Sequence, residues 1–186
     1  LLQELGIAEN TMVLFSSDNG PHQEGGHSAD FFDSNGAKRG MKRDLFEGGV
    51  RVPFIVHWPA RIKRGRVVDD VTAFQDYMPT VCDLLGVEGP KNDGQSMLPI
   101  FTNQRSEAVK RTLYWEFGEQ GGKQSVLQGD WKLVRFGLKD PVYELYNVVQ
   151  DPSDEIDRLS EFPEKATELK KLLESIPDEK SPFRDV

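Results

Sequence analysis

Cysteine, histidine and long hydrophobic runs are all scarce in this sequence of 186 residues. Its single cysteine, Cys82, excludes an intramolecular disulfide and a zinc site built from cysteines, and we interpret it as a buried core thiol. No segment approaches the roughly 18 consecutive apolar residues of a membrane helix, so we expect no membrane span. The chain also lacks an initiator methionine. Leu1–Gly6 has the pattern of the last turns of a helix, which predicts that a longer chain precedes it.

Positive charge is in deficit overall but concentrated in one segment. The 23 lysines and arginines are outnumbered by 31 aspartates and glutamates, which gives a net charge of −8. This balance argues against a nucleic-acid surface, and we expect no nucleic-acid partner. Basic residues nevertheless cluster between positions 38 and 51. The cluster predicts a local anion site, with a solvated loop face as the alternative.

Most of the polar chemistry lies in one loop between two apolar runs. Met12–Phe15 is too short for a helix and is typical of a parallel strand buried on both faces, and Val52–Trp58 reads as a second strand. In an open α/β sheet, ligands bind outside the carboxyl ends of the strands. Asp18 and Asn19 follow the first run directly and are therefore the first candidate site residues, with a plain Asx turn as the structural alternative.

The end of this loop carries two adjacent glycines between basic side chains. Gly48 and Gly49 let the backbone approach other groups closely, while Lys42 and Arg51 on either side have the charge to hold an anion. Glu47 and Arg51 are more readily explained as partners of each other or of loop carbonyls than as substrate contacts. The residues alone therefore predict a cation site beside an anion site.

Several short strings along the chain match one family in their order and spacing. They are Asp18-Asn19-Gly20-Pro21, Lys42 five residues before Glu47-Gly48-Gly49, Arg51-Val52-Pro53, Asp76-Tyr77-Met78-Pro79-Thr80, Asp93-Gly94-Gln95-Ser96, Gly129-Asp130-Trp131-Lys132, and Glu144-Leu145-Tyr146-Asn147 before Asp151-Pro152. With them the chain resembles the C-terminal half of a sulfatase of the arylsulfatase family, within the alkaline-phosphatase-like superfamily.

The resemblance implies roles for Asp18, Asn19 and Lys42, and the positions of His22 and Arg39 in the same loop make them further candidates. Asp18 and Asn19 would supply oxygen ligands to calcium, with magnesium as the alternative, because an amide oxygen suits these ions better than zinc. Lys42 would contact the sulfate and act in catalysis, and Arg39 would contact substrate. His22 would donate a proton to the leaving oxygen or hydrogen-bond the substrate, and a loop histidine without a role is equally compatible with its position.

The activity implied by the resemblance is hydrolysis of sulfate esters of aryl alcohols or sugars. Members of the family use a formylglycine made from a Cys or Ser in a motif that the surroundings of Cys82 lack, so the nucleophile would lie in an N-terminal half absent from this chain. This chain alone is then expected to be inactive. The resemblance implies a periplasmic or secreted location.

The sequence leaves two other functions open. One is a phosphate-ester or phosphonate hydrolase of the same superfamily, which the metal ligands do not exclude. The other is a non-catalytic carbohydrate-binding module. The module would need an exposed aromatic platform, whereas Trp115, Trp131 and Tyr143 fall in alternating patterns that predict core positions.

The predicted fold class is α/β with two parts. Residues 1–105 are expected to form the edge of an alkaline-phosphatase-like parallel sheet with helices. Residues 106–186 are expected to form a small antiparallel sheet covered by a C-terminal helix that starts near Pro163. The expected strands of the small sheet are Thr112–Phe117, Gln124–Gln128, Trp131–Phe136 and Val142–Asn147.

Overall fold

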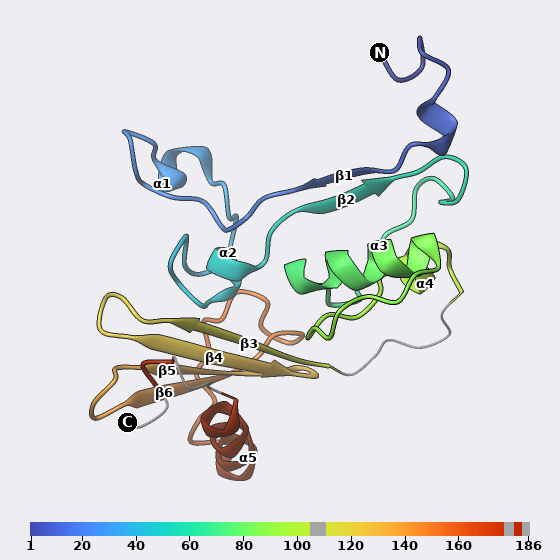
Figure 1. The fold of residues 1–186 in the computed structure, drawn as a ribbon. Coiled ribbons are helices and arrows are strands. Elements are labelled where there is room, and N and C mark those ends of the chain that lie inside the picture. Colours follow the sequence, from blue (N-terminus) through green and yellow to red (C-terminus); the bar gives the residue numbers. More distant parts are fainter. Residues whose placement is uncertain (105–110, 177–180, 184–186) are drawn as a thin grey trace. The chain divides into compact units, whose positions relative to one another are not determined.

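The computed structural model describes residues 1–104, 111–176 and 181–183. The described chain divides into two compact units (Figure 1). The first contains residues 1–16 and 54–104, and the second contains residues 17–53, 111–176 and 181–183. The loop that carries the candidate site therefore groups with the C-terminal sheet. The expected domain boundary after residue 105 stays a prediction.

The first unit is built on two short strands. β1 (Val13–Ser16) and β2 (Phe54–His57) pair antiparallel, with Val13 opposite His57 and Ser16 opposite Phe54. The expectation of parallel strands buried on both faces was wrong for this pair. An apolar run of four residues fits either strand direction. In the described residues one face packs inward while Phe15 and Ile55 on the other face stay exposed.

Short helices complete the first unit. They are η1 (Ala8–Asn10), η2 (Phe74–Asp76), α3 (Tyr77–Leu85) and α4 (Leu98–Phe101). The core of the unit comprises Met97, Ile100 and Phe101, against which Leu14 and Val56 of the strands pack. None of the helices in the described part of the chain is long and apolar enough to cross a membrane.

Two local expectations in this unit were wrong. Residues 1–6 form turns rather than a helix, because they are exposed and have no packing partner to stabilise a helix among the described residues. Cys82 is half-buried rather than part of the core. It lies on α3 between the exposed side chains of Val81 and Asp83.

The second unit contains the predicted small sheet. β3 (Thr112–Phe117), β4 (Lys123–Gln128), β5 (Trp131–Phe136) and β6 (Val142–Asn147) pair antiparallel in sequence order. α5 (Pro163–Ser175) follows them. Both the predicted sheet and the predicted helix are confirmed. They were predictable because alternating strands and a helical stripe with Pro in its first turn are strong local signals.

This sheet is covered on both faces within its unit. On one face Val126, Leu133 and Leu145 pack against Leu169 and Leu173 of α5. On the opposite face Val134 and Tyr146 pack against Leu45 and Phe46, which immediately precede α2 (Glu47–Val50). Figure 1 shows α2 and α5 on opposite sides of the sheet. The C-terminal sheet therefore carries the last part of the long loop.

Candidate functional site

Asp18 and Asn19 lie just beyond the end of β1, as the sequence predicts. Asp18 is exposed and Asn19 is half-buried. The Asn19 side-chain nitrogen donates to the carbonyl of Gly20 at 2.9 Å, and Ser17 Oγ donates to the carbonyl of Asn19 at 2.8 Å. With its nitrogen engaged in this way, Asn19 keeps its amide oxygen available, and that is the atom that binds a hard cation.

These two residues fit a calcium or magnesium ion as part of a ligand set. Calcium takes about six to eight oxygen ligands, and a carboxylate beside an amide oxygen is a suitable pair. Within the described ranges no cluster of three or more His, Cys, Asp or Glu side chains forms a cation site. Any complete shell would therefore need oxygen ligands in addition to those of Asp18 and Asn19.

Lys42 lies beside the same segment through both its backbone and its side chain. Its N–H donates to the carbonyl of Pro21 at 2.8 Å, and its Nζ lies 3.1 Å from Glu24 Oε2. The other oxygen of Glu24 lies 2.6 Å from the Arg43 guanidinium. The Lys42 ammonium, with Arg43 as the second cation, holds the pKa of the Glu24 carboxyl below its usual value. One carboxylate thus bridges two cations.

His22 belongs to this group. Its Nδ1 accepts a hydrogen bond from the Glu24 backbone N–H at 3.0 Å, so the neutral imidazole carries its proton on Nε2. The ring lies 5.2 Å from His27, which stacks on Phe32 at the same centroid distance. The structure therefore brings His22, Glu24 and Lys42 together.

The guanidinium of Arg39 contacts the C-terminal sheet. It donates to the Tyr146 hydroxyl at 2.8 Å, lies 3.5 Å from Glu144 Oε2 and stacks over the Phe46 ring at 3.8 Å. Burial raises the pKa of Tyr146 far above its ordinary value, so the hydroxyl stays protonated and donates to Glu144 at 2.6 Å. A substrate contact of Arg39 stays a prediction.

Glycines join the segments of the site by close backbone contact. Gly20 donates to the carbonyl of Gly49 at 2.9 Å, and a Cβ on Gly20 would lie 1.9 Å from the carbonyl oxygen of Gly48. A Cβ on Gly48 would lie 2.3 Å from the carbonyl oxygen of Gly40, and one on Gly49 would lie 2.1 Å from that of Asp44. No other residue fits at these positions without displacing backbone.

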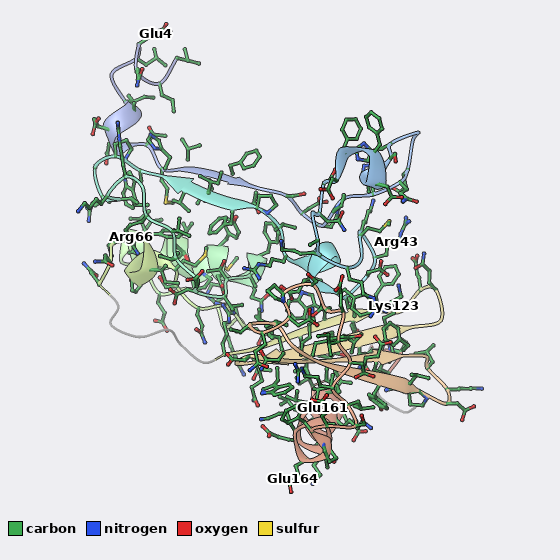
Figure 2. The ribbon with its side chains drawn as sticks, turned by 180° about the vertical axis from the view of Figure 1, so that it is seen from behind. Glu4, Arg43, Arg66, Lys123, Glu161 and Glu164 are labelled. Carbon is green, nitrogen blue, oxygen red and sulfur yellow. The ribbon has the colours of Figure 1, made fainter. Side chains whose placement is uncertain are left out.

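Two lysines of the sheet also hold the loop, and sequence reasoning missed both. Lys123 on β4 lies 2.8 Å from Asp44 Oδ1 and donates to the carbonyl of Arg43 at 3.2 Å (Figure 2). Lys132 on β5 is fully buried and pairs with Glu47 and Asp154. No local signal distinguished either lysine, because β4 and β5 carry other polar side chains and the partners of both lysines lie far away in the sequence.

Glu47 has a second partner. Its other oxygen lies 3.5 Å from the Arg51 guanidinium, so the predicted pairing of these two residues is confirmed. Burial raises the pKa of Asp154, and the Lys132 ammonium opposes that shift. The loop is thus held to the sheet by charged side chains on the face opposite α5.

Comparison with known proteins finds a sulfatase family model and sulfatase relatives. The chain matches the family described as N-sulphoglucosamine sulphohydrolase, C-terminal, over residues 38–181. Steryl-sulfatase of Mus musculus is 44% identical over 113 residues, which cover 57% of this chain and 18% of that protein. N-acetylglucosamine-6-O-sulfatase of Bacteroides thetaiotaomicron is 29% identical over 184 residues, which cover 93% of this chain and 31% of that protein.

A solved structure shows the same fold. A protein in complex with its substrate D-glucosamine-2-N,6-O-disulfate superimposes with a TM-score of 0.74 at 26% identity, covering 97% of this chain and 38% of that one. The predicted α/β fold class with its small antiparallel sheet and C-terminal helix is confirmed. In each of these matches the chain corresponds to less than half of the other protein's length.

Proposed function

Because this chain belongs to the N-sulphoglucosamine sulphohydrolase C-terminal family, we propose that it forms the C-terminal part of a longer enzyme that hydrolyses sulfate esters. One observation of the molecule supports the proposal most directly. The loop between β1 and β2 holds two hard oxygen donors, an ammonium and an imidazole within one hydrogen-bonded segment.

Asp18 and Asn19 are the proposed ligands of a calcium ion, with magnesium as the alternative. The exposed carboxylate and the oriented amide support this assignment. When bound, such an ion would stabilise negative charge on the oxygens of the sulfate group. The other ligands and the formylglycine nucleophile would come from the part of the enzyme that precedes this chain.

Lys42 is the proposed sulfate contact and catalytic cation. Its ammonium is already paired with the carboxylate of Glu24, which supports an anion site at this position. A sulfate ester would take the place of Glu24 beside Lys42. The fixed positive charge would then stabilise the oxygens as charge develops on the leaving group. Arg39 is proposed as a further substrate contact. To reach a substrate, its guanidinium would have to give up the hydrogen bond to the Tyr146 hydroxyl.

His22 is proposed to hydrogen-bond the leaving oxygen or to donate a proton to it. With Nδ1 accepting from the Glu24 backbone, Nε2–H can hydrogen-bond the ester oxygen. Transfer of a proton needs the imidazolium, in which Nδ1 is also protonated and gives up its bond to the Glu24 N–H. The substrate class is a sulfated small molecule or sulfated sugar. The relatives named for sugar sulfates and for steryl sulfates support this range without narrowing it.

The remaining part of the enzyme is the proposed partner of this chain. Val13, Phe15 and Ile55 expose 40%, 61% and 60% of their surface on one face of the β1–β2 pair. Apolar side chains gathered on one face of a sheet favour burial against further structure. Because the chain contains no proposed nucleophile, we expect it to be inactive without that partner.

The test is a paired assay of the longer enzyme with an aryl sulfate and the matching aryl phosphate. We expect a higher kcat/KM for the sulfate, and its loss when calcium is removed with a chelator. A higher kcat/KM for the phosphate would contradict the proposal and favour the phosphate-ester or phosphonate hydrolase. Binding of a sulfated polysaccharide without turnover would favour the carbohydrate-binding module.

The metal assignment has its own test. Calcium titration of the longer enzyme by calorimetry should show weaker binding in Asp18→Ala than in the control Asp30→Ala, an exposed carboxylate on α1 (Ala29–Phe32) of the same loop. Equal affinity of the two variants would remove Asp18 from the ligand set.

A further inference from the structure

A charge cluster is buried beneath the loop that carries Lys42. Lys132 and Asp154 have no exposed surface, and Glu47 exposes 6%. Lys132 Nζ lies 2.9 Å from Glu47 Oε1 and also bonds Asp154 Oδ2. That same Asp154 oxygen accepts from the Glu47 backbone N–H at 2.7 Å. Three residues distant in sequence therefore meet at one point, where α2 begins.

Stability alone is a poor explanation of this cluster. Burying an ion pair costs desolvation that its attraction often fails to recover, and apolar side chains of similar size do as well or better. Asp154 Oδ1 is buried without a hydrogen-bond partner in the part of the chain that the structure describes. What the cluster does provide is a fixed orientation of the groups that it joins, because each of its hydrogen bonds has a required geometry.

The element whose orientation the charge cluster fixes is α2. The next two residues, Gly48 and Gly49, are in backbone contact with both halves of the candidate site. Gly49 accepts the hydrogen bond of Gly20, which directly follows Asn19. Gly48 donates to the carbonyl of Arg39 at 2.7 Å, three residues before Lys42.

These contacts leave little freedom on either side of α2. A Cβ would overlap backbone at Gly20, Gly48 and Gly49, so the three segments are already at their closest approach. A shift of α2 would therefore move the segment of Asp18 and Asn19 and the turn of Lys42 together. In a packed arrangement of this kind displacement is transmitted rather than absorbed.

We propose that Lys132, Asp154 and Glu47 are positioning residues that hold the candidate metal ligands and Lys42 in register from the C-terminal sheet. The proposal rests on the function proposed above. Loss of the cluster would leave every site residue present but misplaced. Because Lys42 is proposed to act on charge that develops in the transition state, misplacement lowers kcat more than it raises KM.

The test compares two buried cations on opposite faces of β5. Lys132→Met removes the cluster, while Arg135→Met removes a side chain that is 3% exposed and bonds Gln124 and the carbonyl of Leu138. Both are made in the longer enzyme and assayed well below their melting temperatures. We expect Lys132→Met to lower kcat about 10- to 100-fold with a smaller change in KM, and Arg135→Met to leave kcat nearly unchanged.

Similar losses of melting temperature with equal kcat in the two variants would overturn the proposal. If Lys132→Met does not fold, Asp154→Asn preserves the shape of the side chain and provides the same comparison. The amide NMR signals of Gly20 and Lys42 in this chain supply a second readout. They should shift in Lys132→Met and stay in place in Arg135→Met. Because these NMR signals do not depend on turnover, they test the positioning role even if the proposed sulfatase function is wrong.

Discussion

At the scale of single residues, Glu24 controls the charge that the loop offers to a ligand. Its carboxylate bridges Lys42 and Arg43, although the side chain is 45% exposed. An ion pair in contact with water is weak and exchanges readily. Glu24 therefore occupies the position of an anion without blocking it, and a bound sulfate would compete with it.

Substituting Glu24 should strengthen anion binding. In Glu24→Gln the ammonium of Lys42 loses its competitor, so we predict that inorganic sulfate inhibits the longer enzyme at a concentration about two- to fivefold lower, with the difference shrinking at high salt. Glu119→Gln, an exposed carboxylate in the same unit, is the control. Unchanged inhibition would show that sulfate does not compete with Glu24.

The same contact has a defined pH dependence. Because Lys42 and Arg43 lower the pKa of Glu24 below 4.5, the carboxylate is favoured more in the folded than in the unfolded chain. Its contribution to stability is thus present above pH 4.5 and is lost as the pH falls through the lowered pKa. A carboxyl ¹³C NMR titration of this chain checks this, and a midpoint at or above 4.5 would contradict the pairing.

The glycines of the site give a second prediction at this scale. In Gly20→Ala the new Cβ meets the carbonyl of Gly48, so we predict that the free energy of unfolding falls by about 1–3 kcal/mol, measured by urea denaturation. Gly118→Ala is the control, because its Cβ would only touch the side chain of Pro182 at 3.2 Å. Equal losses would mean that the loop adapts to a side chain at Gly20.

At the scale of elements, local patterning accounts for what the sequence could predict. The four strands of the small sheet and α5 follow from alternation, turn residues and a helical stripe. The direction of β1 relative to β2 did not follow, because strand pairing depends on contacts beyond the run itself. The burial of Lys132 could likewise not be predicted from local sequence, because its partners lie at positions 47 and 154.

The packing of α5 on the sheet gives a prediction at this scale. Leu169 has no exposed surface and packs in the cluster with Leu133 and Leu145. We predict that Leu169→Ala lowers the free energy of unfolding by about 2–5 kcal/mol. The exposed Glu174→Ala on the same helix should change it by less than about 0.5 kcal/mol. Equal effects in a thermal or urea melt of this chain would mean that α5 does not cover the sheet in solution.

At the scale of the whole molecule, the chain provides a loop with candidate ligands and a sheet that carries the loop. The sequence singled out the candidate site residues because they follow a strand or flank paired glycines, and their roles stay predictions. The motif order resembles a family that the comparisons confirmed. The support from the sheet was not predictable. It depends on residues 17–53 folding with the C-terminal region across more than fifty intervening positions.

The most direct measurement is kcat/KM for sulfate-ester hydrolysis by the longer enzyme carrying Lys42→Ala. Lys63→Ala, an exposed lysine in the other unit, is the matched control. If Lys42 stabilises charge on the transferring group, its removal should lower kcat/KM by about 100-fold or more, while the control stays near the wild-type value. Equal kcat/KM in the two variants would contradict the assignment of the loop as the sulfate site.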